Sequence, residues 1–329
     1  MNIVVLERHS VGEDVSVDEF NKLGNVTIYN NTVTPDEVIE RIAKAQVVVA
    51  NKAPLNENTL KNANELKLIC ELATGFDNVD VDYCKQKGIL VCNVVDYSTD
   101  AVAQHTFALL FYVLEKLRHY DDYVKSGEYA SQSRFSNFDK PFFELAGKTW
   151  GIIGMGHIGK KVAKIANAFG CRVITYSVTG KAESGSVEDS QTGDKYEYVT
   201  FEELLKQSDI ISLHCPLSDL TRGIMNYEAF KKMKDTAILI NVARGPVVVD
   251  ADLKQALDEK LIMAAGLDVT GTEPMRDENP LSKFTDSDRL IITPHLAWAS
   301  IEARRRCVTQ TAKNIEAYQK GERRNVVWE

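Results

Sequence analysis

The chain has 329 residues, more than one hydrophobic core usually serves, so we expect two domains. Hydrophobic residues make up 44% and charged residues 26% of the sequence, a balance typical of soluble globular proteins. The net charge of −8, with both signs interspersed, argues against nucleic acid or an anionic membrane surface as a partner.

Residues 1–6 lack a basic segment and a cleavage site, which favours a strand over a signal peptide. The six cysteines form no CxxC pair, and scattered thiols in a chain without an export signal point to a reducing compartment. No apolar run approaches the roughly 18 residues of a membrane span. We therefore predict a cytoplasmic protein with no membrane partner and no metal site.

The first part of the chain alternates short apolar runs with helical patterns. Thr34 as cap, Pro35 in the first turn and Glu37 three residues after the cap predict a helix start. Strands that alternate with helices indicate βαβ units and a parallel sheet. The strands expected here are 3–6, 47–50, 68–70 and 89–92.

The middle of the chain begins with a segment, 100–117, that is apolar nearly all round. A helix without a polar face must be buried, and we expect it between two domains. The aromatic stretch 129–143 has no strong periodicity, so it is either an arm packed on a partner chain or a loop.

A second αβ series follows, with a polar interruption at 184–194 that predicts a surface loop. A final helix at about 300–320 carries apolar residues at helical spacing and is expected to pack on an earlier domain. The strands expected in this series are 149–153, 172–176, 209–214, 237–241, 264–267 and 290–292.

The segment Gly154-Met155-Gly156-His157-Ile158-Gly159 matches GxGxxG between an expected strand and an expected helix. Gly154 would make the tight turn, Gly156 would let the backbone approach a diphosphate, and Gly159 would let helix and strand pack closely. The diphosphate would sit at the helix N-terminus, where N–H groups and the helix dipole favour an anion. This context predicts a dinucleotide site.

The end of the next strand bears on the choice of cofactor. A carboxylate about 20 residues past the glycines normally binds the ribose hydroxyls and repels a 2′-phosphate. Ser177 stands in that place, followed by Thr179 and Lys181, so small hydroxyls and a cation are available for a phosphate. We expect NAD or NADP, with Ser177 slightly favouring NADP; alternatively, Ser177 only relaxes the selectivity.

Polar residues follow several strands of the second series, where a parallel sheet binds its ligand. Singly, Arg244 is equally explained as a surface ion pair, Asp268 as a cap and His295 as a satisfied histidine. Their convergence on one edge of one sheet favours a functional site.

The chain resembles the D-2-hydroxyacid dehydrogenase family along nearly its whole length. Within that family, the segment 295–300 is similar to bacterial glycerate dehydrogenases, also called hydroxypyruvate reductases. The matching pieces are 73–80, 102–106, the glycine turn, 214–217, 241–245, 266–269 with Glu273-Pro274, and 293–295.

The resemblance implies a catalytic set of Arg244, Glu273 and His295. A protonated His295 would give its proton to the keto oxygen as hydride arrives, and Glu273 would stabilise the imidazolium. Arg244 would bind the substrate carboxylate, with backbone N–H groups near Thr74 and Gly75 on its other side. His105 is expected to be structural. The implied cofactor-binding residues beyond the glycine turn are Ser177, Thr179, Cys215, Pro216, Thr221, Val242, Ala243 and Asp268.

Some positions depart from the family pattern. Gln104 stands where many members carry Glu, Thr270 where an aromatic is frequent, and nothing at Lys52-Ala53 selects one acid. Trp298 either narrows the pocket in favour of a short acid or is an aromatic of the domain interface.

The resemblance thus predicts an NAD(P)-dependent oxidoreductase that interconverts a small 2-keto acid, best hydroxypyruvate or glyoxylate, and its D-2-hydroxy acid. The alternatives are D-lactate, phenyllactate or another D-2-hydroxy acid and, in a different class, a non-catalytic NAD-sensing protein of the corepressor kind. The expected architecture is two doubly wound parallel-sheet domains in each chain. Two such chains are expected to form a homodimer. A Rossmann cofactor domain at 101–296 would be inserted into a flavodoxin-like substrate domain at 1–100 plus 297–329.

Overall fold

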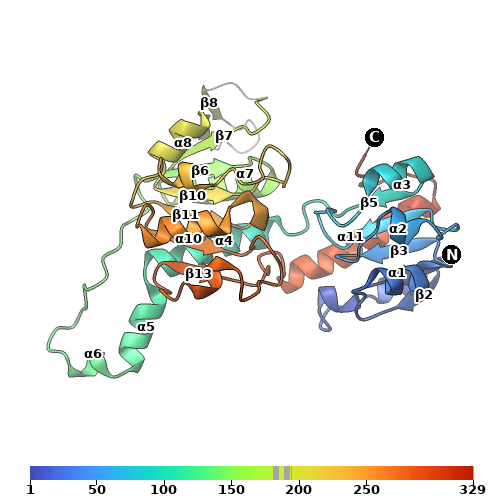
Figure 1. Cartoon of the computed structure of the whole chain (residues 1–329), viewed down its shortest axis with the longest axis horizontal. Coiled ribbons are helices and arrows are strands. Elements are labelled where there is room, and N and C mark those ends of the chain that lie inside the picture. The colour runs from blue at the N-terminus through green and yellow to red at the C-terminus, as the bar shows by residue number, and fades with distance from the viewer. Residues whose placement is uncertain (181–184, 189–192, 194, 329) are drawn as a thin grey trace. The chain divides into compact units, whose positions relative to one another are not determined.

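A computed structural model describes residues 1–180, 185–188, 193 and 195–328. The chain divides into two compact α/β units, a first unit of Met1–Ser98 with Trp298–Glu329 and a second unit of Thr99–Ala297. The sequence placed these boundaries at 100/101 and 296/297. The predicted fold class is confirmed, because each unit is built on its own largely parallel sheet (Figure 1).

The first unit has a five-stranded parallel sheet in the order β2-β1-β3-β4-β5, the flavodoxin-like arrangement. Its strands are β1 (Asn2–Val5), β2 (Asn25–Ile28), β3 (Val47–Ala50), β4 (Leu68–Glu71) and β5 (Leu90–Cys92). The helices are α1 (Pro35–Ile42), α2 (Glu57–Leu60), α3 (Val81–Lys87) and α11 (Ile301–Gln319), with 3-10 turns at Arg8–Val11 and Asp18–Lys22.

The core of the first unit joins the sheet to helices from both ends of the chain. The capping box predicted at Thr34 and Glu37 is present at the start of α1. Val38 of α1 shares a core cluster with the strand residues Val48 and Ile69. The C-terminal helix α11 packs against β4, as expected, and its red ribbon lies with the blue strands in Figure 1.

The second unit has an eight-stranded sheet in the order β13-β12-β11-β10-β6-β7-β9-β8, parallel except for β8. Its strands are β6 (Thr149–Ile153), β7 (Arg172–Tyr176), β8 (Gly185–Glu188), β9 (Lys195–Tyr198), β10 (Ile210–Leu213), β11 (Ile238–Asn241), β12 (Ala264–Leu267) and β13 (Leu290–Ile292). The strand order reverses between β6 and β10, the place where doubly wound sheets bind their ligands.

The helices of the second unit are α4 (Thr99–Leu114), α5 (Leu117–Lys125), α6 (Glu128–Ser131), α7 (His157–Ala168), α8 (Phe201–Gln207), α9 (Tyr227–Phe230) and α10 (Asp250–Asp258), with 3-10 turns at Gly245–Val247 and Pro280–Lys283. The apolar helix α4 packs against α7 and against β11, β12 and β13 of its own unit. Its burial is therefore explained within the second unit, without a place between the domains.

Three short strands, β2, β8 and β9, were not predicted from the sequence. The polar loop predicted at 184–194 contains β8, which pairs antiparallel with β9 at the sheet edge. The strand β2 was not predicted at all, because it is only four residues long and mostly exposed. Edge strands need little hydrophobic burial, and this explains why an apolar pattern does not reveal them.

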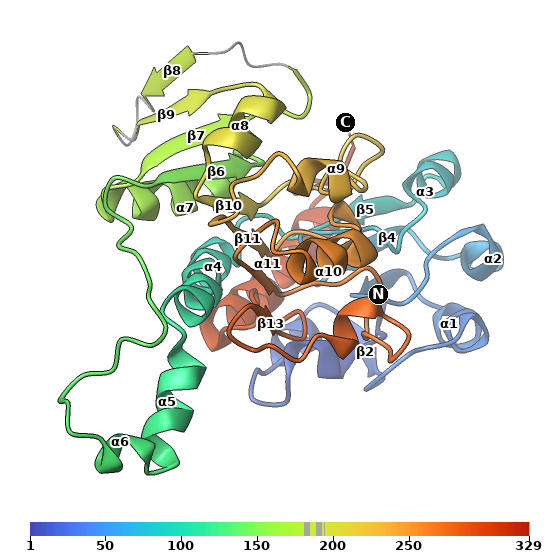
Figure 2. The same cartoon turned by 60° about the vertical axis from the view of Figure 1, so that its left-hand side comes forward.

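The segment after α4 is the least packed part of the second unit. Neither α5 nor α6 buries a side chain, and both views show them, with the chain that follows, extending away from the sheet of their own unit (Figure 2). The exposed fractions of Phe135, Phe138 and Phe142 are 90%, 73% and 58%. The segment therefore extends from its unit, and the two predicted alternatives, an arm packed on a partner chain or a loop, both stay predictions.

Candidate active site

The carboxyl ends of five strands in the second unit form one row. The parallel pairing sets Leu213 of β10 opposite both Ile153 of β6 and Asn241 of β11. Leu267 of β12 lies opposite Asn241 and opposite Ile292 of β13. The residues that follow these strands therefore emerge at a single edge of the sheet, as the sequence predicted.

The glycine turn connects β6 to α7 at this edge. Gly154 has a φ of 102°, and an added Cβ would lie 2.4 Å from the backbone nitrogen of Cys215. A Cβ on Gly159 would lie 2.2 Å from the carbonyl oxygen of Gly154, so this glycine lets helix and strand approach. Around Gly156, the N-cap of the 12-residue helix α7, a Cβ would meet no described atom within 4 Å.

The surroundings of the three glycines suit the binding of a dinucleotide diphosphate. Open space over Gly156 lets an anion reach the first N–H groups of α7, where the helix dipole adds a favourable potential. His157 and Ile158 form the first turn of that helix. Beyond β7, Ser177 accepts the N–H of Gly180 on its carbonyl oxygen at 3.0 Å, and Ser177 and Thr179 are both partly exposed. Lys181, also considered for a phosphate, lies outside the described residues.

The segment after β10 is tightly bonded to itself. The hydroxyl of Thr221, a residue 1% exposed, donates to the carbonyl of Pro216 at 2.7 Å and accepts the N–H of Ser218 at 2.8 Å. Thr221 therefore shapes this turn rather than offering its hydroxyl to a ligand. Burial raises the pKa of the Cys215 thiol to about 11, so this residue can line a site but is no nucleophile.

His214 belongs to a buried polar chain behind the glycine turn. Its Nε2 lies 3.0 Å from the hydroxyl of Ser212, which accepts the indole N–H of Trp150 at 2.8 Å. The Nδ1 atom of His214 is buried without a hydrogen-bond partner among the described residues. Burial lowers the pKa of His214 to about 3, so the ring is neutral at physiological pH.

Arg244 follows β11 in a loop that Asn241 shapes. The amide of Asn241 donates to the carbonyl of Arg244 at 3.1 Å and accepts the N–H of Ala243 at 3.0 Å. Val242 and Ala243 are only 9% and 7% exposed, whereas Arg244 is partly exposed. The loop therefore buries its apolar residues and presents the guanidinium.

The loop after β11 touches the loop after β12. A Cβ on Gly245 would lie 1.7 Å from the carbonyl oxygen of Thr270, so only glycine allows this approach. The N–H of Thr270 donates to Oε1 of Glu273 at 3.3 Å, and its hydroxyl donates to the carbonyl of Thr272 at 2.9 Å. Thr270, which stands where the family often has an aromatic, thus helps to hold Glu273.

Glu273 and His295 are in direct contact. Nδ1 of His295 donates to Oε2 of Glu273 across 2.7 Å, and the two side chains remain 27% and 33% exposed, respectively. Such a contact fixes the orientation of the ring. Arg244, Glu273 and His295 thus come from consecutive loops at the same edge of the sheet.

Asp268 supports the segment that carries His295. Its carboxylate accepts the hydroxyl of Thr293 at 2.6 Å and the N–H groups of Leu296 and Ala297 at 2.9 and 2.8 Å. Asp268 is 1% exposed, and Nε2 of His105 lies 3.0 Å from the Thr293 hydroxyl. The expected partner of the nicotinamide amide is therefore, in the first place, an internal anchor.

In the first unit, Thr74 and Gly75 follow β4. The Thr74 hydroxyl donates to the carbonyl of Val94 at 2.9 Å, and the amide of Asn93 donates to the carbonyl of Thr74 at 2.7 Å. Among the described residues, the N–H groups of Thr74 and Gly75 have no recorded hydrogen bond. Their N–H groups thus remain candidates for a carboxylate.

Two other departures named from the sequence also lie in the first unit. The carboxylate of Glu7 accepts the N–H groups of Lys52 and Ala53, at 2.9 and 3.0 Å. The Trp298 ring lies edge-on to Tyr97, with ring centroids 6.2 Å apart. Glu7, to which no sequence pattern pointed, therefore fixes the loop at 52–53.

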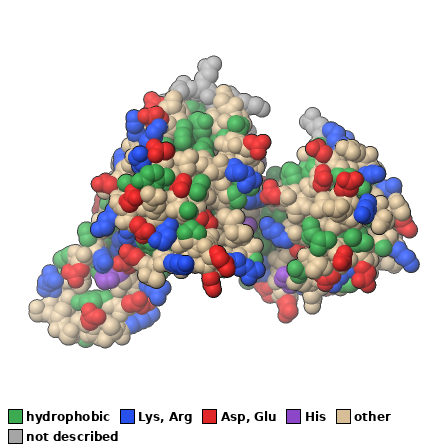
Figure 3. All heavy atoms as spheres, in the orientation of Figure 1, with side chains coloured by type: hydrophobic (Ala, Val, Ile, Leu, Met, Phe, Trp, Pro, Cys, Tyr) green, Lys and Arg blue, Asp and Glu red, His purple; other side chains and the backbone are tan. Residues whose placement is uncertain are grey.

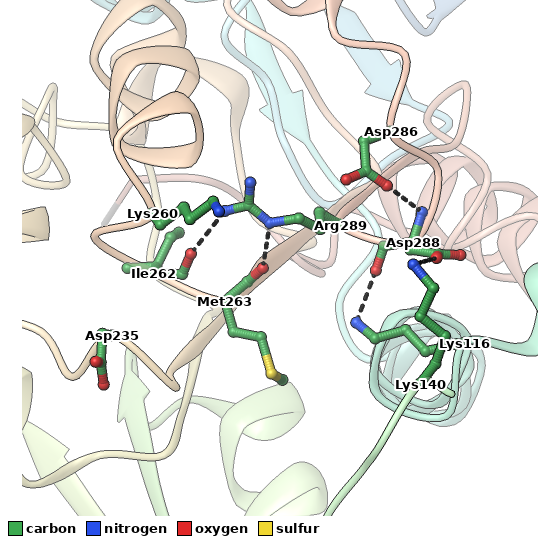
Figure 4. A pocket seen from close by; sticks show the side chains of 9 residues that line it. All are labelled: Lys116, Lys140, Asp235, Lys260, Ile262, Met263, Asp286, Asp288 and Arg289. Carbon is green, nitrogen blue, oxygen red and sulfur yellow. Dashed lines mark hydrogen bonds and ion pairs between the residues drawn. The ribbon is translucent and has the colours of Figure 1, made fainter. Parts of the chain in front are cut away.

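A cavity of about 310 Å³ lies at the opposite edge of the second sheet (Figure 4). Met263 and Arg289 precede β12 and β13, so this is the amino end of the strands. Arg289 donates to the carbonyl of Met263 at 3.0 Å, Lys116 donates to the carbonyl of Asp288 at 2.9 Å, and Lys140 pairs with the Asp288 carboxylate at 3.2 Å. The cavity therefore belongs to the scaffold. It is lined by Lys116, Lys140, Asp235, Lys260, Ile262, Met263, Asp286, Asp288 and Arg289.

Among the described residues, neither surface charge nor clusters of metal-ligating side chains indicate a second site. The face drawn in Figure 3 carries acidic and basic side chains interspersed, so an anionic substrate would be attracted locally rather than by a broad positive field. The described residues contain no group of three or more His, Cys, Asp or Glu side chains placed to hold a metal ion. No helix among them is long and apolar enough to cross a membrane.

Sequence reasoning missed the residues that hold the site together. Asn241 and Thr270 act within their own loops, Asn241 through its side-chain amide and Thr270 through its backbone N–H. The Thr293 hydroxyl instead joins two loops, because its partner Asp268 lies 25 positions earlier. Asn241 and Thr293 stood inside quoted motifs, which was the only signal available. Glu7 had no signal at all, because its partners lie more than 40 positions away.

Comparison with known proteins identifies the family. Residues 107–297 match the model of the D-isomer specific 2-hydroxyacid dehydrogenase NAD-binding domain. A hydroxypyruvate reductase from Blautia hydrogenotrophica is 39% identical over 330 residues, covering 99% of both chains.

Solved structures agree. A D-lactate dehydrogenase from Aquifex aeolicus, complexed with NAD and lactic acid, superimposes with a TM-score of 0.82 at 32% identity, over 98% of this chain and 96% of that one. An acyclic imino acid reductase in complex with NADPH and D-Arg does so with a TM-score of 0.87 at 30% identity, over 100% of each chain. This chain belongs to the D-isomer specific 2-hydroxyacid dehydrogenase family and carries that family's NAD-binding domain.

Proposed function

We propose that the protein reduces a short 2-keto acid to the D-2-hydroxy acid, with hydroxypyruvate or glyoxylate as the best substrate. The observation that carries the proposal is the 2.7 Å contact between Nδ1 of His295 and the carboxylate of Glu273. With Nδ1 engaged, Nε2 is the ring nitrogen that gives its proton to the keto oxygen. The presence of Arg244 at the same edge favours an acid over a neutral ketone.

The division of labour in the second unit follows from the residue chemistry. Arg244 binds and orients the substrate carboxylate through its planar guanidinium and polarises the keto group. Glu273 holds the imidazolium in one orientation, which prepares the proton before charge develops on oxygen. In the first unit, the N–H groups of Thr74 and Gly75 are candidates for binding a carboxylate.

The glycine turn would hold NADH or NADPH, which supplies the hydride when bound. Gly156 and the first turn of α7 bind the diphosphate, and Ser177 and Thr179 face the ribose. Without a carboxylate at 177, nothing at this position repels a 2′-phosphate, so we propose that NADPH is accepted and slightly preferred. Ser177→Asp should shift the preference toward NADH, because the new carboxylate would bind the ribose hydroxyls and repel the phosphate.

The test is the initial rate of NADH and NADPH oxidation with hydroxypyruvate, glyoxylate, pyruvate and phenylpyruvate. We expect the highest kcat/KM with hydroxypyruvate or glyoxylate and a product of D configuration. A higher value with pyruvate or phenylpyruvate would favour the alternative D-lactate or phenyllactate activity. Tight cofactor binding without turnover of any acid would favour the NAD-sensing alternative.

We also propose that the protein is a cytoplasmic homodimer. The described cysteines are all unpaired and buried, as suits a reducing compartment. The arm at 117–143 carries the exposed Phe135 and Phe138, whose apolar rings are well suited to an interface between two copies of this chain. Phe135→Ser with Phe138→Ser should yield monomers in analytical ultracentrifugation, whereas a dimer that survives both changes would contradict this use of the arm.

A further inference from the structure

We propose that His105 is a positioning residue for the reaction, which holds the His295 segment in place through Thr293 and Asp268. The inference rests on the proposed function, in which His295 donates the proton. It changes the role of His105, which the sequence suggested to be structural only.

The contacts form a short relay inside the second unit. His105 lies on α4, and its Nε2 is 3.0 Å from Oγ1 of Thr293. That hydroxyl donates to Oδ1 of Asp268 at 2.6 Å. The other carboxylate oxygen of Asp268 accepts the N–H of Ala297 at 2.8 Å, so the relay ends on the backbone just beyond His295.

The proton positions in this relay follow from the acceptor in the middle. The Asp268 carboxylate can only accept hydrogen bonds, so the Thr293 hydroxyl must donate its one hydrogen to this carboxylate. Oγ1 of Thr293 is left with lone pairs toward the imidazole, and Nε2 of His105 must therefore carry the hydrogen. The structure thus selects the Nε2–H tautomer of His105.

Burial keeps this ring neutral. The side chain of His105 is 17% exposed, and burial lowers its pKa, while Asp268, with Oδ1 3.5 Å from Nε2, partly opposes the shift. A neutral donor suits the relay, because it fixes the Thr293 hydroxyl without neutralising the carboxylate that holds the backbone of the segment.

The held segment has a conformation that needs support. His295 has a φ of 52°, in the left-handed region that non-glycine residues adopt rarely. Its N–H donates to the carbonyl oxygens of Asp268 and Thr293 at 2.8 and 3.0 Å. Any loosening of these two residues therefore moves the His295 backbone, and with it the 2.7 Å contact to Glu273.

The first test compares His105→Leu with His105→Gln in the full chain. The leucine variant loses the donor, and we expect kcat for keto-acid reduction to fall by about tenfold, with a smaller change in KM. The pH at which the reduction rate declines should move lower, because the imidazolium loses part of its support. The glutamine variant retains an N–H donor at similar reach and should restore most of both.

A double-mutant cycle separates a relay from two independent structural effects. Thr293→Val removes the same relay at its middle, so the double variant with His105→Leu should lose no more activity than either single variant. The matched control is Thr106→Val on α4, where the buried hydroxyl donates to the helix carbonyl of Val102 at 2.8 Å. It should leave the rate within twofold of wild type and the pH profile unchanged.

A second readout needs no turnover. Nitrogen-15 NMR of histidine-labelled protein should show the His105 ring as the neutral Nε2–H tautomer near pH 7 and unchanged by added acid substrate. The Nδ1–H tautomer would overturn the inference whether or not His105→Leu folds.

Two further outcomes would also overturn it, additive losses in the double-mutant cycle or an unchanged pH profile in folded His105→Leu. If His295→Ala abolishes turnover while the His105 variants match wild type, the relay alone is refuted. If His295→Ala retains full activity, the proposed function itself fails.

Discussion

In both units the strand ends align in a row across the sheet, and polar side chains follow the row. In the first unit Val49 lies opposite both Val5 and Cys70, and in the second Leu267 lies opposite both Asn241 and Ile292. The use of the polar groups differs. The first unit bonds most of them to its own backbone, whereas the second leaves an ion pair partly exposed.

The first unit shows the internal use clearly. Glu7, only 4% exposed, accepts backbone N–H groups of Asn51, Lys52 and Ala53. Glu71 at the end of β4 is fully buried, and the amide of Asn78 donates to it at 3.2 Å. Glu7 therefore fixes a loop, whereas Oε2 of Glu71 is buried without a hydrogen-bond partner among the described residues.

In the second unit the buried groups stand behind the exposed ones. Asp268 and Thr270 are 1% and 5% exposed, and they hold the segments of His295 and Glu273, whose side chains reach solvent. The comparison teaches that polar residues at a strand edge do not by themselves mark a reactive site. The pair proposed to react differs from them in its partial exposure on top of a buried, hydrogen-bonded support.

The largest expected effect is on Arg244, which marks the reactive edge. Arg244→Lys keeps the charge and loses the planar fork, so kcat/KM for keto-acid reduction should fall by roughly 100-fold or more. The control is Arg172→Lys, an arginine at the amino end of β7 whose guanidinium bonds Gln207 and Glu197. Steady-state kinetics of both variants provide the measurement, and equal effects would remove Arg244 from the site.

A pair of glycines in the second unit separates fold from ligand binding. Gly159→Ala places a Cβ 2.2 Å from a backbone oxygen, so the free energy of unfolding should drop by about 2 kcal/mol or more. Gly156→Ala has room, so the melting temperature should hold while the Kd for NADPH rises. Calorimetry and fluorescence titration distinguish the two. Equal effects of the two substitutions on stability and on the Kd for NADPH would contradict the assignment of their roles.

The first unit should lose stability as the pH rises. Burial raises the pKa of Glu71 to about 8 from 4.5, so the folded protein retains a proton that the unfolded chain releases. The contribution is complete below pH 4.5 and is lost as the pH rises to 8, by at most about 4 kcal/mol. Glu71→Gln should flatten this dependence in hydrogen exchange measured on β4, while an unchanged slope would exclude Glu71 as its cause.

The second unit should respond in the opposite direction. The pKa of His214 falls from 6.5 to about 3, so the unfolded chain takes up a proton that the buried ring refuses. The contribution of neutral His214 to stability is complete above pH 6.5. It is lost as the pH falls toward 3, by up to about 2 kcal/mol at pH 5. His214→Gln should reduce the acid sensitivity of hydrogen exchange in β10. Equal acid sensitivity in both proteins would assign the effect to other groups.

The sequence predicted most of the scaffold and the residues now placed in the proposed site. Apolar strands and the glycine turn are visible because burial and a close backbone approach impose patterns within a few consecutive residues. The contact between His105 and Thr293 was not visible, since the two residues lie 188 positions apart. The bond from the Thr270 N–H to Glu273 was not visible either, because it depends on the conformation of a single loop. The strands β2, β8 and β9 were also missed, and β2 is mostly exposed, so burial imposes no apolar run on it.

The most direct test of the account is a pair of measurements on His295→Ala, the rate of hydroxypyruvate reduction and the Kd for NADPH. Because the proton donor and the cofactor site occupy different loops of the second unit, we predict a fall in kcat of at least about 100-fold with a Kd near that of wild type. A variant that still turned over at a comparable rate, or that lost turnover only through lost cofactor binding, would contradict the assignment of His295.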